Sequence, residues 1–247
     1  MNDMNGNTVA LVTGGSRGIG AATALRLAED GFDVALTYVN GAGSAAEVVG
    51  KIEALGRRGL AVRADAGAAD GPRTAVEETV RALGRLDVLV NNAGAGVVGP
   101  LDTLGPAEVD LVLGVNVRGA FLAAQAAAAR MGSGGRIVTI GSCMVGRVPG
   151  PGGTLYAMSK AAMTGLTKSL ARELGGRGIT ANLVHPGPTD TDMNPADGPY
   201  ADAQRSMTAL GRYGTPEEVA AMVSFLAGPD SAYVTGAEFS VDGGHAA

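Results

Sequence analysis

A tyrosine and a lysine four residues apart, Tyr156 and Lys160, form the pair in this sequence best suited to proton transfer. Residues 156–174 are rich in alanine, which favours a helix, and positions i and i+4 of a helix share one face. At about 4 Å and an effective dielectric constant of about 20, an ammonium would stabilise a phenolate by about 4 kcal/mol before desolvation. We therefore expect Lys160 to lower the phenol pKa from about 10, so that Tyr156 acts as a general acid or base. Taken alone, this spacing is more typical of an ordinary exposed pair on a helix surface.

Two further polar residues occupy positions that suggest chemistry. Ser142 follows an apolar run at residues 135–140 that is typical of a buried strand, so its hydroxyl would lie at the carboxyl edge of a sheet and could donate to a substrate carbonyl. Asn116 falls in the middle of a predicted helix over 106–131, where an amide is mildly unfavourable and implies a compensating role. The alternatives are a solvent-facing turn serine and a helix-capping or solvent-facing asparagine.

A glycine-rich stretch near the start of the chain has the spacing T-G-x-x-x-G-x-G, with Gly14, Gly18 and Gly20. It follows an apolar run at 9–12 and precedes a helix-like run at 21–30, so it predicts a strand, a tight turn and a helix. The free N–H groups and positive dipole end of such a helix suit a pyrophosphate. A glycine-rich turn without any ligand is the alternative.

The rest of the chain repeats this alternation and predicts one α/β domain spanning 1–247. Strands between helices give parallel pairs, and continuous apolar runs mean that helices cover both faces of the sheet. We predict a doubly wound, Rossmann-type parallel sheet of about seven strands, with ligands at the carboxyl ends of the strands. The predicted strands are 9–12, 33–39, 60–63, 86–90, 135–140, 179–184 and 238–241, and the predicted helices are 21–30, 44–56, 71–84, 106–131, 156–174 and 216–227.

Composition limits the partners. The net charge is −5 and no cluster of Lys and Arg stands out, which disfavours nucleic acid and anionic membranes. Without a signal peptide or an apolar run near 20 residues, we expect a cytoplasmic protein. His185, His245 and Cys143 lack metal-ligand spacing, so no metal site is expected, and Cys143 is interpreted as a small packed residue.

Five motifs together resemble the short-chain dehydrogenase/reductase family over nearly the whole chain. The chain overall, including its ending at residues 236–244, resembles the β-ketoacyl-acyl carrier protein reductase branch of that family. The five motifs are T-G-x-x-x-G-x-G, N-N-A-G at residues 91–94, Ser142, Y-x-x-x-K at residues 156–160 and P-G-x-x-x-T at residues 186–191. The resemblance implies that Tyr156 donates a proton, Ser142 polarises the carbonyl, Lys160 holds the ribose hydroxyls, and Asn116 holds a water that links Lys160 to solvent. It also implies a homotetramer.

The cofactor preference depends on the end of the second strand, where NAD-selective proteins place Asp or Glu. That position is Tyr38 here, and Asp33 is at the opposite end, so we predict NADP(H), with Arg17 receiving the ribose phosphate near Asn40 and Ser44. Arg17 as a solvated loop residue is the alternative. The predicted cofactor-binding residues are Gly14, Ser16, Arg17, Gly18, Ile19, Gly20, Tyr38, Asn40, Asp65, Asn92, Ala93, Gly94, Tyr156, Lys160, Pro186, Gly187, Thr189 and Thr191.

These observations predict an NADPH-dependent carbonyl reductase that acts reversibly on a small ketone or a 3-oxoacyl compound, with a substrate lid at 188–211. Residues 131–134 lack the basic side chains that the resemblance associates with an acidic acyl carrier, which puts carrier docking in doubt. A non-catalytic NADP-binding regulatory or scaffold protein is the main alternative. A third alternative, a sugar-nucleotide epimerase or dehydratase, is disfavoured because such enzymes normally need a substantial further carboxyl-terminal domain.

Overall fold

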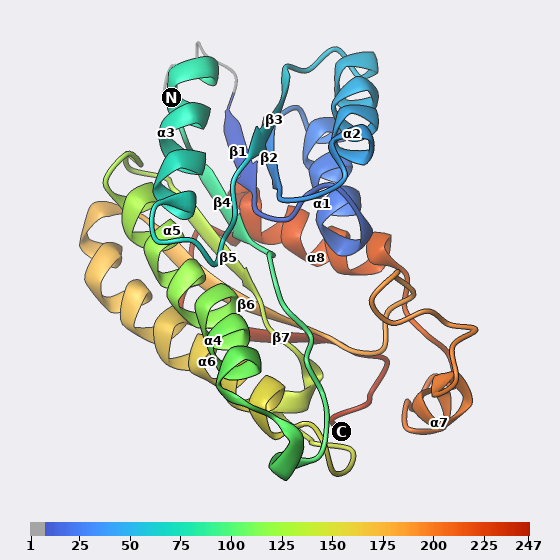
Figure 1. The fold of residues 1–247 in the computed structure, drawn as a ribbon. Helices are drawn as coiled ribbons and strands as arrows, with labels where there is room; N and C mark the ends of the chain where they lie inside the picture. The colour runs from blue at the N-terminus through green and yellow to red at the C-terminus, as the bar shows by residue number, and fades with distance from the viewer. Residues whose placement is uncertain (1–7) are drawn as a thin grey trace.

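Seven parallel strands form a single twisted sheet in the computed structural model, which describes residues 8–247 (Figure 1). Their order is β3-β2-β1-β4-β5-β6-β7. The central strands are buried along their whole length, which explains why they are apolar without alternation. The strands are β1 (Val9–Val12), β2 (Asp33–Tyr38), β3 (Gly59–Arg63), β4 (Val88–Asn91), β5 (Arg136–Ile140), β6 (Thr180–Pro186) and β7 (Glu238–Val241).

Helices cover both faces of the sheet. On one face α1 (Gly18–Glu29), α2 (Ala42–Ala54) and α8 (Pro216–Ala227) bury a core that includes Leu27, Ile52 and Leu226. On the other face α3 (Gly71–Leu83), α5 (Ala120–Ala128) and α6 (Thr154–Leu174) bury a second core, with α4 (Pro106–Leu113) beside α6 (Figure 1). The prediction of a doubly wound parallel sheet is confirmed.

The predicted single helix over 106–131 is wrong in its middle. A π-helical segment, Gly114–Gly119, separates α4 from α5 and contains Asn116. A π segment inserts one residue into a helical turn and so shifts the side chains after it, and such segments are frequent at functional sites.

The same run meets the length and composition of a membrane-spanning helix. Pro106–Ala128 is 23 residues long, and an 18-residue window within it has a mean hydropathy of 1.4. Half of that window is buried inside the fold, as in the core helix of a soluble protein.

Residues 188–211 contain a short helix, α7 (Ala201–Ser206), that the sequence pattern did not predict. An isolated bridge from Thr189 to Gly214 ties the start of this segment to the chain that follows it, and a second bridge from Thr191 to Asn194 closes a turn within it. The segment extends away from the sheet on the side of its carboxyl edge (Figure 1).

The strand order reverses between β1 and β4. From β1 the chain continues to β2 and β3 on one side of the sheet, and from β4 it continues to β5, β6 and β7 on the other side. Ligands of doubly wound sheets bind at the carboxyl ends of the strands beside such a reversal. The glycine-rich turn after β1, residues 91–94 at the end of β4 and Ser142 after β5 all lie at this edge.

Candidate active site

Tyr156 and Lys160 share one face of α6, as predicted, and the Lys160 Nζ lies 5.8 Å from the centre of the Tyr156 ring. Lys160 is buried, and its ammonium donates to the Ile140 carbonyl oxygen at 3.0 Å. Burial disfavours the charged form and lowers the pKa of Lys160 to about 8. The ammonium is therefore still mostly protonated at neutral pH, directly beneath the end of β5.

The pKa of Tyr156 moves in the direction opposite to our prediction. Burial of the phenol raises its pKa, and a hydrogen bond with Ser142 offsets only part of that rise. In the cofactor-free protein, desolvation therefore outweighs any attraction from Lys160. The phenol is protonated at neutral pH and is ready to donate.

Ser142 follows β5 in an extended conformation and lies beside the Tyr156 phenol. The Met144 N–H donates to the Ser142 Oγ at 3.2 Å, which anchors the oxygen beside the phenol. Two hydroxyl donors, from β5 and from α6, thus meet at the carboxyl edge of the sheet. Such a pair suits an oxygen that gains negative charge during a reaction.

The glycine-rich turn requires glycine for two separate reasons. Gly18 has a φ of 53°, which disfavours any side chain, and a Cβ at Gly20 would lie only 2.3 Å from the Gly14 carbonyl oxygen. Within residues 8–247, no side-chain hydrogen bond caps the start of α1. The first-turn N–H groups of α1 are thus open to an anion.

Residues 91–94 brace this turn from the neighbouring strand. The Thr13 hydroxyl accepts hydrogen bonds from the Asn92 and Ala93 N–H groups, both at 3.0 Å. The Asn92 side-chain amide donates to the Thr13 and Gly14 carbonyl oxygens at 2.9 and 3.0 Å. The side-chain amide of Asn92, a residue predicted to bind cofactor, thus stabilises the conformation of the turn.

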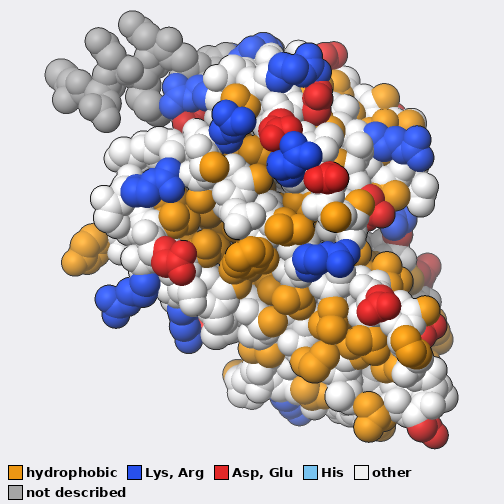
Figure 2. Space-filling model, turned by 60° about the vertical axis from the view of Figure 1, so that its left-hand side comes forward, with side chains coloured by type: hydrophobic (Ala, Val, Ile, Leu, Met, Phe, Trp, Pro, Cys, Tyr) orange, Lys and Arg blue, Asp and Glu red, His pale blue; other side chains and the backbone are white. Residues whose placement is uncertain are grey.

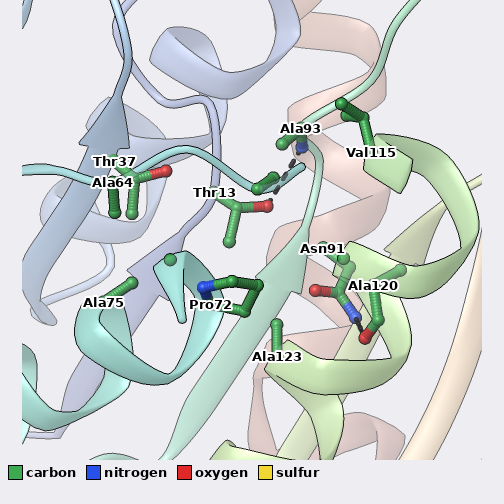
Figure 3. A pocket seen from close by; sticks show the side chains of 13 residues that line it. Thr13, Thr37, Ala64, Pro72, Ala75, Asn91, Ala93, Val115, Ala120 and Ala123 are labelled. Atoms are coloured by element: carbon green, nitrogen blue, oxygen red, sulfur yellow. Dashed lines mark hydrogen bonds between the residues drawn. The ribbon is translucent and has the colours of Figure 1, made fainter. Parts of the chain in front are cut away.

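A small hollow of about 10 Å³ lies behind this brace, beneath the ends of β1 and β4 (Figure 3). Figure 3 shows Thr13 bound to Ala93, and the Asn91 amide, which donates to the Ala120 carbonyl oxygen at 3.1 Å. The hollow holds at most one water molecule. The hollow is too small for a dinucleotide.

Asn116 ties the π segment to the loop after β4. Its Oδ1 accepts from the Ala95 N–H at 2.8 Å, and its Nδ2 donates to the Ala95 carbonyl oxygen at 3.0 Å and to the Ser159 Oγ at 2.9 Å. A Cβ at Gly94 would lie 3.5 Å from the Lys160 Nζ and 3.6 Å from the Asn116 Oδ1, so this loop contacts both residues. The Asn116 side chain is satisfied by protein partners, which compensates its place inside a helix.

Comparison with known proteins agrees with this geometry. A family model described as enoyl-(acyl carrier protein) reductase matches residues 14–246. The cyclic-di-GMP-binding biofilm dispersal mediator protein of Escherichia coli strain K12 is 44% identical over 98% of both chains. The 3-oxoacyl-[acyl-carrier-protein] reductase of a Synechocystis strain is 41% identical over 96% of both chains. A solved short chain dehydrogenase from Burkholderia cenocepacia, in complex with NADP, is 55% identical with a TM-score of 0.97, over 98% of this chain and 99% of that one.

The chain belongs to the short-chain dehydrogenase/reductase family. It is thereby a member of a family of NAD(P)-dependent oxidoreductases.

The remaining residues expected to bind cofactor in this short-chain dehydrogenase/reductase lie along the same edge. Tyr38 ends β2 and is half buried, Asn40 is exposed beyond it, and Asp33 is buried at the opposite end in an ion pair with Arg58 at 2.8 Å. Arg17 is 73% exposed and lies 3.7 Å from Asp192.

On the β6 side of the edge, Pro186 ends the strand and Gly187 follows it. The Thr189 hydroxyl donates to the Gly187 carbonyl oxygen at 3.0 Å, and Thr191 contacts Gly18 of the glycine-rich turn. Asp65, after β3, accepts from the Gly67 N–H at 2.8 Å. These positions fit a dinucleotide because they surround an uncapped helix start at the strand reversal.

Two polar residues of this short-chain dehydrogenase/reductase were missed or misread from its sequence. Ser159 accepts from Asn116 and donates to the Tyr156 carbonyl oxygen at 2.7 Å. His185, considered only as a metal ligand, contacts the backbone of Ser142. Cys143 is the packed residue that was predicted, and burial together with Asp242 raises its thiol pKa to about 11.

Proposed function

We propose that this protein is an NADPH-dependent carbonyl reductase that converts a ketone to a secondary alcohol, reversibly. The observation that carries the proposal is the meeting of the Tyr156 phenol and the Ser142 hydroxyl above the buried Lys160 ammonium. The raised pKa of Tyr156 keeps the proton on the phenol at neutral pH, so the residue is in the protonation state that carbonyl reduction requires.

Each residue has a defined part in the proposed reaction. Bound NADPH would supply the hydride that adds to the carbonyl carbon. Tyr156 donates its proton to the carbonyl oxygen, and the Ser142 hydroxyl donates a hydrogen bond to the same oxygen as its negative charge grows. Lys160 places a positive charge beneath the phenolate that remains and holds the ribose hydroxyls. Asn116 takes part in the resupply of the proton through a water on the path from Lys160.

The proposed preference for NADP(H) over NAD(H) depends on charge at the edge of the sheet. Tyr38 takes the place at which a carboxylate would repel a ribose phosphate, and the exposed Arg17 supplies a guanidinium nearby. The related Burkholderia cenocepacia enzyme, crystallised with NADP, supports this choice. Dissociation constants for NADPH and NADH test it, and tighter binding of NADH would contradict it.

The proposed substrate is a small ketone or 3-oxoacyl compound with an apolar body. Exposed Val98, Val148 and Met193 belong to three segments that meet beside the catalytic residues, because the Gly99 N–H donates to the Gly152 carbonyl oxygen at 2.9 Å and Met193 contacts Gly96. The lid at 188–211 supplies Met193. The turn at 131–134 precedes β5 and so lies at the opposite edge of the sheet, which gives no support to carrier docking there within one subunit.

The test of the function is the oxidation of NADPH, followed by absorbance, with a panel of ketones, 3-oxoacyl thioesters, a 2-enoyl thioester and a 3-oxoacyl carrier protein. We expect turnover with ketones or free 3-oxoacyl compounds, and a secondary alcohol as product. Turnover of the enoyl thioester alone would replace carbonyl reduction with reduction of a carbon–carbon double bond.

Tyr156→Phe removes the proposed acid and keeps the aromatic packing. We expect kcat to fall by about 10² to 10⁴ fold, because the proton donor is lost, while NADPH affinity and the melting temperature stay close to those of the wild type. The matched control is Tyr233→Phe at a fully exposed tyrosine, which should keep full activity. Turnover that survives in Tyr156→Phe would refute the assignment.

A second candidate is an NADP-binding regulatory or scaffold protein without catalysis. It is favoured by one comparison, the 44% identity to a protein named as cyclic-di-GMP-binding. Isothermal titration with cyclic-di-GMP and with NADPH distinguishes the two functions. Binding of both compounds, with no carbonyl turned over across the panel, would favour the second candidate.

We also propose a homotetramer located in the cytoplasm. Hydrophobic side chains gather across the lower half of the face shown in Figure 2, and Leu111 on α4, Phe121 on α5 and Met158 on α6 are each about half exposed. Contiguous exposed apolar surface is typical of an interface between subunits. The molar mass in solution, measured by light scattering, tests the assembly.

A further inference from the structure

His185 is a buried imidazole near the end of β6, with polar partners on both ring nitrogens. We propose that His185 is a positioning residue that holds Ser142 in its productive orientation. The proposal rests on the proposed function, since it assigns a role in aligning the hydroxyl that polarises the carbonyl.

One ring nitrogen faces the backbone of the serine directly. The His185 Nδ1 lies 2.9 Å from the Ser142 carbonyl oxygen and 3.2 Å from the Ser142 nitrogen. The preceding residue, Gly141, leaves the room for this contact, because a Cβ there would lie 2.5 Å from the Nδ1. The imidazole therefore packs against the two peptide units that flank the Ser142 Cα.

The other ring nitrogen is fixed by a carboxylate on the edge strand. The His185 Nε2 lies 3.0 Å from the Glu238 Oε2, which also accepts from the Thr164 hydroxyl at 2.8 Å, while Lys168 pairs with the Oε1 at 2.9 Å. Burial raises the pKa of Glu238, but hydrogen bonds from Lys168, Thr164 and His185 outweigh it and lower the pKa to about 2. Glu238 is thus ionised, and we infer that the Nε2 carries a proton to donate to it.

The proton on the Nε2 determines whether the Nδ1 donates or accepts a hydrogen bond. With its proton on the Nε2, the neutral ring has a lone pair on the Nδ1, which accepts from the Ser142 N–H at 3.2 Å. This hydrogen bond ties the Ser142 backbone to β6. Together with the Met144 N–H on the Oγ, this bond fixes both ends of the serine.

The orientation of Ser142 matters because a donor stabilises developing charge only at the correct distance and angle. A misplacement of about 1 Å can cost about 10² fold in rate. Loss of the His185 contact should therefore reduce kcat and leave the binding of the cofactor unchanged.

Two substitutions separate the two ring nitrogens. His185→Asn keeps a polar atom at the δ position, next to Ser142, and His185→Gln keeps one at the ε position, next to Glu238. We expect His185→Asn to retain kcat within about fivefold and His185→Gln to lose about 10 to 100 fold, with similar dissociation constants for NADPH. A role in packing alone predicts the reverse order, because glutamine fills more of the space. Lys168→Gln, which alters only the exposed partner of Glu238, is the control and should keep its kcat.

A second readout does not depend on turnover. Hydrogen exchange of the Ser142 amide, measured by NMR on the cofactor-free protein, should be slow in the wild type and in His185→Asn but at least tenfold faster in His185→Gln. Equal exchange in all three proteins overturns the proposal, whether or not a ketone is reduced. An inactive wild type with the expected exchange pattern would instead count against the proposed function.

Discussion

The burial of Lys160 has a thermodynamic cost as well as a chemical purpose. An ammonium in the core loses its hydration, and the lowered pKa, about 8 instead of 10.5, expresses that cost. A shift of this size corresponds to about 3 kcal/mol of stability lost at neutral pH. The buried charge that the proposed reaction needs therefore lowers the free energy of unfolding of the protein.

Lys160→Met should therefore stabilise the protein and abolish turnover. We expect the variant to melt several degrees higher at pH 7, because about 2 kcal/mol is regained after loss of the bond to Ile140 is counted. The unfolded chain binds a proton at this position between pH 8 and pH 10.5 that the folded protein does not, so wild-type stability rises across that window. The difference in melting temperature between Lys160→Met and the wild type should therefore narrow as the pH approaches 10.5.

Calorimetry at pH 7 and at pH 10 measures both effects. Lys168→Met, at an exposed lysine, is the control, and it should show no such gain. A variant of Lys160 that melts at or below the wild-type temperature at pH 7 would show that the ammonium does not destabilise the fold.

Among the elements, the π segment Gly114–Gly119 most directly shapes the site. It presents Asn116 to Ala95 and Ser159, and it approaches the loop after β3 so closely that a Cβ at Gly119 would lie 2.4 Å from the Ala66 carbonyl oxygen.

Gly119→Ala should push the π segment away from this loop. We expect a loss of about 1–3 kcal/mol in the free energy of unfolding and a clear fall in kcat as Asn116 moves. Gly50→Ala in α2 is the matched control, because its Cβ would meet open space and the change should stabilise that helix by about 0.5–1 kcal/mol. Chemical denaturation compares the two, and equal stability changes would contradict the close approach at Gly119.

The elements also show which features a sequence can predict. The strands followed from apolar runs, and the facing of Tyr156 and Lys160 followed from helical spacing, because both depend on neighbours close in the chain. The π segment was not predicted, and the close approach of Gly119 to Ala66 beside it joins residues far apart in the chain. The contact of His185 with Glu238 and the raised pKa of Tyr156 likewise arise only from tertiary packing. The cofactor residues are gathered at one edge as expected, and their contacts with a dinucleotide stay a prediction.

At the scale of the whole molecule, the strand reversal divides the sheet into two halves with separate tasks. The half with β1, β2 and β3 carries the glycine-rich turn, Tyr38 and Asp65, and the half with β4, β5 and β6 carries Ser142 and supports α6 (Figure 1). The two halves share both hydrophobic cores but have different functional side chains. The choice of nucleotide should therefore be separable from the chemistry.

Tyr38→Asp tests this separation. A carboxylate at the end of β2 would repel a ribose phosphate and accept bonds from ribose hydroxyls, so we expect KM for NADPH to rise at least tenfold and KM for NADH to fall. The kcat with the better nucleotide should stay within a few fold of the wild type. Tyr38→Asn, which loses the same packing without adding charge, is the control, and an equal loss of NADPH affinity in both variants would exclude the effect of charge.

The contacts of Thr191 and Asp192 with the glycine-rich turn also impose an order on events. These two residues border the proposed substrate entrance, and the turn that they contact would hold the phosphates of the nucleotide. Substrate and nucleotide would therefore enter through the same opening. We expect the nucleotide to bind before the substrate and to leave after the product. Each turnover would then require residues 191–192 to move away from the glycine-rich turn.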